Sequence, residues 1–563
     1  MLFPRSKDTV LIDFKQSQDR SNNTMRLPKP VRDNLSFLLA ETTAQARNLQ
    51  VLLETSSKSA AQRIIDRRGY AYNLKMRIHD GCMTAARRAR RNGALDVLSL
   101  RAAEVIATEL EDITELGQDC VRQLSGQKRK AILESLTATK FIDNLIAGVL
   151  LIRKSLEEDD TQTALKIGNI ARKVNKKHTV FFDKQSRGLK KQKYPADTIV
   201  TLLVARNLNE MGAALLGISE AIISAKLGHT MHTERFRSLE TAFVDLGLNE
   251  GLVESIAETK SGSAISGISE GDQDGYVAIF KDGQKEKLKE ERESVKSWHE
   301  IFPGLAPRIL SYRKRGANAS LLIEHLPGFT FEQVLLNESD ALLASTIKHL
   351  GKTVQDVWNE TKRSRKVPAK HMSQLRKRLD SVRGVHQNFS LGGEKICSAS
   401  TRSLDQLINK VEALENKIHA PFSVYIHGDF NLDNIIFDPD NRRINFIDLH
   451  RSCYSDYIQD VSVLMVSSYR LQVLDTRTRK RIRLVATRFY EIVAEYAHKN
   501  DDKTFELRLA FGLGRSFITS TRFILDKSLA KAMYLRGCYI LERASEQTVK
   551  TAPQFKLPIK ELF

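Results

Sequence analysis

The segment Tyr425–Arg470 constrains the fold and chemistry of this chain more than any other. It contains a His-Gly-Asp sequence ending at Asp429, then Asn434, and later a second acid, Asp448. Residues 435–447 form two short apolar runs around Asp-Pro-Asp-Asn, a strong turn signal, and we expect a β-hairpin there. Because a hairpin brings its two ends together, Asn434 and Asp448 are expected to face one cavity.

These side chains have the chemistry that phosphoryl transfer from a nucleoside triphosphate needs. Magnesium takes hard oxygen ligands in octahedral geometry, and Asn434 offers an amide oxygen and Asp448 a carboxylate. Asp429 stands where it can accept the proton of an attacking hydroxyl group. His427 is expected to brace the loop rather than to take part in the chemistry.

The length and composition set limits on what surrounds this segment. A chain of 563 residues predicts two to four domains at roughly one domain per 150 residues. No apolar run approaches the roughly 18–20 residues that span a bilayer, and no secretion signal opens the sequence. The five cysteines are scattered without a CxxC pair, which predicts a cytoplasmic protein without structural zinc.

The formal net charge of +20 favours anionic partners, or it reflects basic residues that solvate helix faces; both alternatives stay open. The densest basic run, residues 86–92, has no interleaved aromatic side chains. A base-stacking surface is therefore not indicated, and we do not expect a nucleic acid partner.

The N-terminal part predicts an all-helical bundle over residues 31–230, after a tail at 1–30. No proline occurs between Pro30 and Pro195, and apolar residues recur at steps of three and four. The first such stripe consists of Leu35, Leu38, Leu39, Thr42, Ala46, Leu49 and Leu53.

Two stretches of this part, Leu100–Gln123 and Thr201–Ser224, resemble the signature helices of the PhoU-type phosphate-uptake regulators, which are built from two three-helix repeats. In that family each such helix carries two acids four residues apart that can bind metal. The resemblance places one pair on Glu111 and Glu115, although an exposed acidic helix face is the favoured interpretation of these two residues. The second repeat has Asn and Ala at the matching positions, which leaves a metal cluster there in doubt.

A change of composition predicts a second domain. We expect a linker at 231–262 and, from 263 onward, strands around Gly267, Gly271 and Gly275 followed by helices. The fold class predicted for the whole chain is therefore multidomain: an all-α PhoU-like bundle and an α+β domain at 263–563.

The motifs of this second domain resemble those of the aminoglycoside phosphotransferase and choline kinase-like family, which has the bilobal protein-kinase fold. His-Gly-Asp, Asn434, the hairpin, Asp448 and a trailing Asp456-x-x-x-Asp460 carry the resemblance. It implies an N-lobe at about 263–326 and a C-lobe at about 327–563. It also implies that Asp429 is the catalytic base and that Asp460 supports the catalytic loop.

The resemblance further implies a nucleotide-binding lobe upstream. Lys281 ends a β-run and would reach the phosphates of ATP, and Glu293 would be its ion-pair partner. The backbone of Glu324, His325 and Leu326 would meet the adenine as a hinge, and the turn at residues 267–275 would cover the phosphates. Nearby alternatives stay open for the lysine and for its partner: Lys285, Lys287, Lys289, Glu290 and Glu291.

The expected function is an ATP- and magnesium-dependent kinase that phosphorylates a hydroxyl group of a small molecule or a protein. The helical domain would regulate it and would contact a phosphate-transport or signalling partner. The alternative is a non-enzymatic nucleotide-binding regulator linked to phosphate uptake. The sequence leaves the acceptor, the choice of ATP over GTP and the oligomeric state open.

Overall fold

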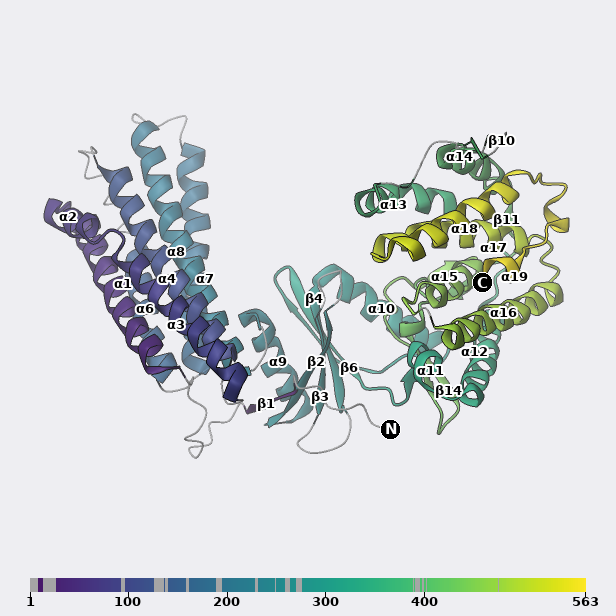
Figure 1. Cartoon of the computed structure of the whole chain (residues 1–563), viewed down its shortest axis with the longest axis horizontal. Helices are drawn as coiled ribbons and strands as arrows, with labels where there is room; N and C mark the ends of the chain where they lie inside the picture. The colour runs from purple at the N-terminus through teal and green to yellow at the C-terminus, as the bar shows by residue number, and fades with distance from the viewer. Residues whose placement is uncertain are drawn as a thin grey trace. The chain divides into compact units, whose positions relative to one another are not determined.

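The computed structural model describes residues 9–13, 27–92, 97–125, 136, 140–157, 161–188, 195–227, 231–248, 250–258, 264–269, 276–387, 389, 395–396, 399–400, 402–473 and 475–563. The chain divides into two compact units (Figure 1). The first unit consists of Met1–Ala257 and Ser266–Tyr276, and the second of Glu258–Ile265 and Val277–Phe563.

The first unit is mainly helical. Its elements in chain order are β1 (Thr9–Asp13), α1 (Lys29–Thr55), α2 (Lys58–Asp66), α3 (Tyr70–Asn92), α4 (Val97–Leu124), α6 (Phe141–Glu157), α7 (Thr161–Gly188), α8 (Pro195–Leu227), α9 (Thr233–Leu246) and β2 (Glu250–Glu258), and β3 (Ala264–Ser269) follows at the division between the units.

Long helices that pack side by side form the core of this unit, which confirms that the N-terminal part is helical (Figure 1). Helix α4 packs against α1, α3 and α8, and α7 packs against α6 and α8. Every residue of the predicted stripe on α1 is buried. A period of three and four residues places those side chains on one face, and removing such a face from water is the main source of helix stability.

The linker and tail predicted from sequence contain regular structure instead. Residues 231–262 hold α9 and β2, and β1 in the tail pairs antiparallel with β2. Helix α9 buries Phe236, Leu239 and Phe243 and ends at Gly247, whose φ of 71° provides the left-handed cap. The sequence contains both the short apolar face of α9 and its glycine cap. Because polar residues surround them, these two signals are too short to predict a helix in this segment.

One helix among those described, α8, is long and apolar enough to cross a membrane by length and composition. Of its most apolar window, 44% is buried inside the unit, where it contacts α4, α6 and α7. The core helix of a protein in water has the same properties, so α8 is weak evidence for a span.

The second unit begins with a small antiparallel sheet and continues mainly as helices. Its described elements are β4 (Ala278–Gln284), α10 (Lys285–Ile301), β5 (Ile309–Arg315), β6 (Asn318–Glu324), β7 (Phe329–Thr330), α11 (Phe331–Asn337), α12 (Asp340–Thr361), β8 (Val367–Pro368), α13 (His371–Val385), β9 (Lys395–Ile396), β10 (Ala399–Ser400), α14 (Leu404–Glu415), β11 (His419–Ala420), β12 (Val424–Ile426), η2 (Leu432–Asn434), β13 (Ile435–Asp438), β14 (Arg443–Phe446), β15 (Cys453–Ser455), α15 (Ile458–Tyr469), α16 (Thr476–Lys499), α17 (Phe505–Ser520), η3 (Thr521–Phe523), α18 (Lys527–Ser545), η4 (Ala552–Gln554) and α19 (Ile559–Leu562).

Two parts of this unit position the candidate site. In the small sheet, β6 pairs antiparallel with both β4 and β5, and α10 packs against it. In the helical part, β13 and β14 form the hairpin predicted from sequence. The Asp438 carboxylate closes its turn by accepting hydrogen bonds from the backbone N–H groups of Asp440 and Asn441, as an aspartate in a turn does.

A buried ionic cluster ties α17 to the loop before α15. The Arg508 guanidinium is fully buried and pairs with the carboxylates of Asp456 and Asp502. The Tyr457 hydroxyl donates a hydrogen bond to Asp502 over 2.6 Å. The charges of these two buried carboxylates are therefore balanced by a single cation, the Arg508 guanidinium.

Replacing Arg508 by Met should destabilise the second unit by about 3–5 kcal/mol, because it leaves two buried carboxylates without a counter-charge. The matched control is Arg488→Met, which breaks an exposed pair with Glu491 and should cost less than about 1 kcal/mol. Urea denaturation measures both changes, and equal stabilities of the two variants would contradict the assignment.

Candidate active site

The loop between β12 and η2 is held by one buried carboxylate. Asp460, on α15, accepts hydrogen bonds from the backbone N–H groups of His427 at 2.7 Å and Gly428 at 2.8 Å. Gly428 has a φ of 82°, and a Cβ atom there would lie 2.3 Å from the Arg451 carbonyl oxygen. Only glycine fits this position, and the resulting turn presents Asp429 to the cavity.

The His427 ring braces this loop from inside. Its Nε2 atom donates to the Ile447 carbonyl oxygen at 2.9 Å, and its Nδ1 atom accepts from the Asp429 backbone N–H at 3.3 Å. Burial lowers the pKa of His427, because a desolvated imidazolium is disfavoured. The ring is thus a neutral link between the loop and the end of the hairpin.

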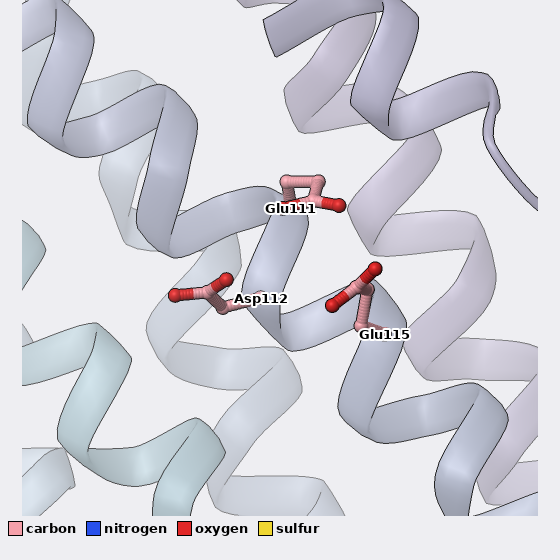
Figure 2. Close-up of side chains that lie close together, drawn as sticks. All are labelled: Glu111, Asp112 and Glu115. Carbon is pink, nitrogen blue, oxygen red and sulfur yellow. The ribbon is translucent and has the colours of Figure 1, made fainter.

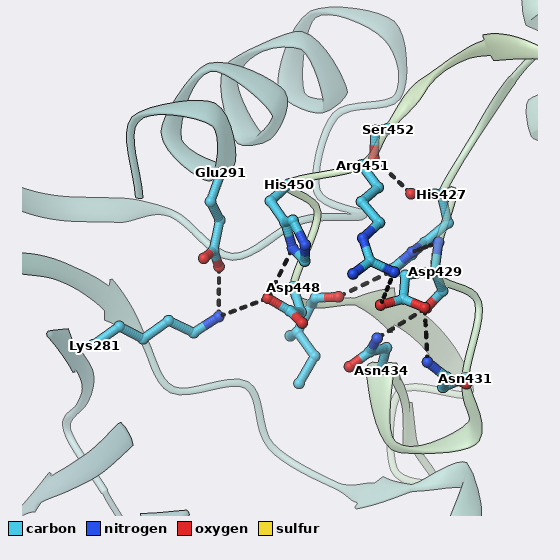
Figure 3. A network of polar contacts seen from close by, with 11 residues as sticks. Lys281, Glu291, His427, Asp429, Asn431, Asn434, Asp448, His450, Arg451 and Ser452 are labelled. Carbon is cyan, nitrogen blue, oxygen red and sulfur yellow. Dashed lines mark hydrogen bonds and ion pairs between the residues drawn. The ribbon is translucent and has the colours of Figure 1, made fainter. Parts of the chain in front are cut away.

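Asp429 is the acid that this loop exposes, with 21% of its side chain accessible. Its Oδ1 atom accepts a hydrogen bond from the Asn431 amide at 2.9 Å, and its Oδ2 atom lies 3.0 Å from the Arg451 guanidinium (Figure 3). The Asn434 Nδ2 atom donates to the Asp429 carbonyl oxygen at 2.9 Å. Asn431 and Arg451 were not identified from sequence. Asn431 stands two residues after Asp429, and Arg451 stands three residues after Asp448.

Asp448 follows the hairpin with a φ of 60°, a left-handed conformation that an aspartate tolerates better than most residues. Its carboxylate lies 3.7 Å from the Lys281 ammonium and 3.3 Å from the His450 ring (Figure 3). Burial acts to raise the pKa of Asp448, but the His450 hydrogen bond and the Lys281 charge outweigh it and lower that pKa. The group is therefore an anion at neutral pH.

The three predicted residues of the hairpin region share one cavity. Asp429, Asn434 and Asp448 all line a hollow of about 600 Å³ within the second unit, a volume in the range of small-molecule sites. The hydrogen bond from Nδ2 of Asn434 leaves its Oδ1 atom without a hydrogen-bond partner among the described residues. An amide oxygen and a carboxylate thus border the cavity.

Lys281 pairs with Glu291, and the prediction of Glu293 as its partner is wrong. The Lys281 Nζ atom lies 2.5 Å from Glu291 Oε1, and both side chains are buried. Burial acts to lower the pKa of Lys281, but Glu291 and Asp448 raise it. The Glu293 side chain is 55% exposed, and its ion pair is a 3.9 Å contact with Arg292.

Helix periodicity explains the correction. The buried positions of α10 are Leu288, Glu291, Val295 and Trp298, spaced by three, four and three residues. Glu291 lies on this stripe and Glu293 does not. The sequence contained this signal, because Glu291 is a charged residue at a position where the helix period predicts an apolar one.

The predicted hinge follows the sheet directly. The pairing of β6 ends at Glu324, so the peptide groups of His325 and Leu326 lie beyond the strand pairing. The Glu324 carboxylate binds Arg308, accepting from its backbone N–H at 2.9 Å, and burial lowers the pKa of His325. Of the predicted phosphate-covering turn, residues 270–275 lie outside the described residues.

The acids predicted on the helical unit gather on one face of α4. Ligand atoms of Glu111, Asp112 and Glu115 lie within 4.8 Å of one another (Figure 2). The Lys75 ammonium lies 2.7 Å from Glu111 and already neutralises one of the three charges. Glu111 is buried and its ion pair with Lys75 accounts for it without a metal, so an exposed acidic face describes Glu115 but not Glu111.

Comparison with known proteins finds a similarity in the C-terminal part. Residues 270–488 match the model of the phosphotransferase enzyme family. This match confirms the predicted resemblance of this stretch to a phosphotransferase family, and it supports a kinase-type phosphotransferase. No curated protein matches the chain in sequence. No comparison supports the PhoU-like assignment of the helical unit, which stays a prediction.

Solved structures with similarity to the chain include three kinases. An aminoglycoside-3'-phosphotransferase of type VIII is 16% identical and has a TM-score of 0.32, with 47% of this chain and 92% of that chain covered. Plasmodium vivax ethanolamine kinase is 12% identical (TM-score 0.31; 52% and 81% covered). A putative fructosamine-3-kinase from Haemophilus somnus is 11% identical (TM-score 0.32; 55% and 97% covered).

The two glutamates of α10 allow a direct test of the ion pair. Glu291→Gln should weaken the binding of ATP with magnesium by roughly tenfold or more, because a charge-assisted contact is worth about 1.5–3 kcal/mol. Glu293→Gln removes the same charge two residues away and should leave the affinity unchanged. Calorimetric titration distinguishes them, and a larger loss in Glu293→Gln would contradict the pairing.

Asp460 should make stability depend on pH. Burial raises its pKa to about 7, so the folded state binds a proton that the unfolded chain releases near pH 4. This stabilisation is complete below about pH 4 and is lost as the pH rises to about 7. Relative to Asp460→Asn, the unfolding free energy of the wild type should fall over this range by an amount on the order of 4 kcal/mol. A constant difference between the two proteins across this range would contradict the shift.

Proposed function

We propose that the second unit transfers the γ-phosphoryl group of ATP to a hydroxyl group of its acceptor. One observation carries the proposal: an acid on a braced loop, an amide and a carboxylate at the two ends of a hairpin, and a buried lysine meet at one place (Figure 3). The match to the phosphotransferase family covers all four residues.

The residues at the cavity fit a magnesium ion and the phosphates of ATP. Asn434 and Asp448 would hold the ion through oxygen atoms, the ligands that magnesium prefers. When bound, the ion would neutralise charge on the phosphate oxygens. Lys281, oriented by Glu291, would contact the phosphates as a fixed cation, and the backbone of Glu324, His325 and Leu326 would meet the adenine.

Asp429 would orient the acceptor and take its proton. The hydroxyl oxygen forms a bond to the γ-phosphorus, the bond from that phosphorus to the bridging oxygen breaks, and ADP leaves. The hydroxyl proton passes to the Asp429 carboxylate. His427 and Asp460 hold the loop, so that the carboxylate meets the hydroxyl without rearrangement, and positioning supplies much of the rate in this class of reaction.

For the helical unit we propose a regulatory role of the kind that its resemblance to PhoU-type proteins implies. The pattern of long helices supports this, and a phosphate-transport or signalling protein would be the partner. A cytoplasmic location would give the second unit access to ATP. A small-molecule acceptor and a protein acceptor are both compatible with this scheme.

Two substitutions separate the proposed roles. Asp429→Asn should retain magnesium-dependent nucleotide binding and lose at least about 100-fold in turnover, because general-base catalysis contributes typically that much. Asp448→Asn should lose the magnesium dependence of binding as well as turnover. Calorimetry and release of labelled ADP measure the two properties.

The control is Asp440→Asn, an acid in the turn of the hairpin outside the cavity lining. It should keep both properties. An ATP turnover that Asp429→Asn leaves unchanged would reject the enzyme and favour a nucleotide-binding regulator. Equal losses of binding in the Asp429 and Asp448 variants would reject the division of roles.

A further inference from the structure

Four arginines surround Asp429 in the cavity, and they come from separate segments of the second unit. Arg378 is on α13, Arg515 on α17 and Arg522 on η3, while Arg451 lies in the loop after β14. All four line the same hollow of about 600 Å³ as Asp429. The acceptor side of the proposed reaction is therefore rich in guanidinium groups.

These cations are poorly neutralised by the protein itself. Arg451 pairs with Asp429, but within the described part of the chain no carboxylate lies within 4.0 Å of the Arg378, Arg515 or Arg522 guanidinium. Arg515 donates to Gln459 and Ser462 at 3.1 Å, and its buried Nε atom has no hydrogen-bond partner. Three guanidinium groups thus keep donors that no carboxylate among the described residues satisfies.

Burial and mutual repulsion act together on this cluster. Burial lowers the pKa of Arg515 to about 9, with a contribution from Arg378. Burial and the charges of Arg378 and Arg451 lower the pKa of Arg522 to about 10. All of these groups remain cations at neutral pH, and the repulsion between them is relieved when an anion binds.

The acids of the cavity balance these four cations only in part. Asp429 is the cavity acid that faces Arg378, Arg515 and Arg522. Glu415 also acts on Arg515, but it lies outside the cavity lining. Of the remaining cavity acids, Glu332 and Asp433 interact with a fifth arginine, Arg470, and Asp448 pairs with Lys281 and His450.

We propose that the acceptor already carries a phosphate monoester, which Arg378, Arg515 and Arg522 bind while a hydroxyl of the same molecule meets Asp429. The inference rests on the proposed function, because it names the acceptor class of that reaction. A phosphate has three strongly accepting oxygens and suits donors that converge from three segments. An amine acceptor would add a further cation to the cluster and would be repelled.

The first test compares matched acceptors on the full-length protein with ATP and magnesium. The pairs are glucose and glucose 6-phosphate, glycerol and glycerol 3-phosphate, and myo-inositol and its monophosphate, with gluconate and glucosamine as carboxylate and amine arms. At least one phosphorylated member should have a kcat/KM that exceeds that of its neutral partner by about tenfold or more. A preference for the neutral, carboxylate or amine compounds would overturn the inference.

The second test measures the binding of inorganic phosphate by calorimetry, in the presence of magnesium and a nonhydrolysable ATP analogue. Arg378→Gln and Arg522→Gln should each raise the Kd for phosphate by about tenfold, and Arg378→Lys should recover part of the loss. The control Lys377→Gln removes an exposed charge beside Arg378 and should bind like the wild type. Phosphate binding that is absent, or equal in Arg378→Gln and Lys377→Gln, would overturn the inference.

The two proposals fail in different ways. Turnover of neutral or amine acceptors that requires Asp429 but not Arg378 would reject the phosphorylated acceptor and leave the phosphotransferase intact. An absence of Asp429-dependent turnover on every acceptor would reject the phosphotransferase and its acceptor together, even if phosphate still binds.

Discussion

The candidate site depends on the contact between the Asp460 carboxylate and the two backbone N–H groups of His427 and Gly428. A buried carboxylate is costly unless donors surround it, so this contact fixes the loop and α15 relative to each other. The left-handed turn at Gly428 then directs Asp429 into the cavity. His427 extends the same constraint to Ile447 at the end of the hairpin, one residue before Asp448. Asp429, the proposed base, and the candidate metal ligands thus share one rigid support.

Short-range sequence patterns predicted the hairpin and the residues at its two ends correctly. The hairpin followed from two apolar runs around a turn, and Asn434 and Asp448 border one cavity because hairpin ends meet. The helical N-terminal part followed from its apolar stripes. Glu291 was one of the open alternatives to Glu293, and its place on the buried face of α10 is the signal that distinguishes the two.

Features that arise from tertiary packing could not be predicted in this way. Arg378, Arg451 and the Arg515–Arg522 pair are far apart in the sequence, and only the packing of their segments brings them to one cavity. Arg508 likewise pairs with Asp456, which is 52 residues away in the sequence. The net charge of +20 was compatible with an anionic partner, yet a total charge carries no information on where cations converge.

The central claim is that Asn434 and Asp448 hold a divalent ion against the phosphates of a nucleotide beside Asp429. Manganese in place of magnesium tests it most directly, through the paramagnetic broadening of phosphorus-31 resonances of a bound nonhydrolysable ATP analogue. We expect strong broadening of the β- and γ-phosphorus signals in the wild type and its loss in Asn434→Leu. Broadening that is the same in both proteins, or nucleotide binding without any metal dependence, would contradict it.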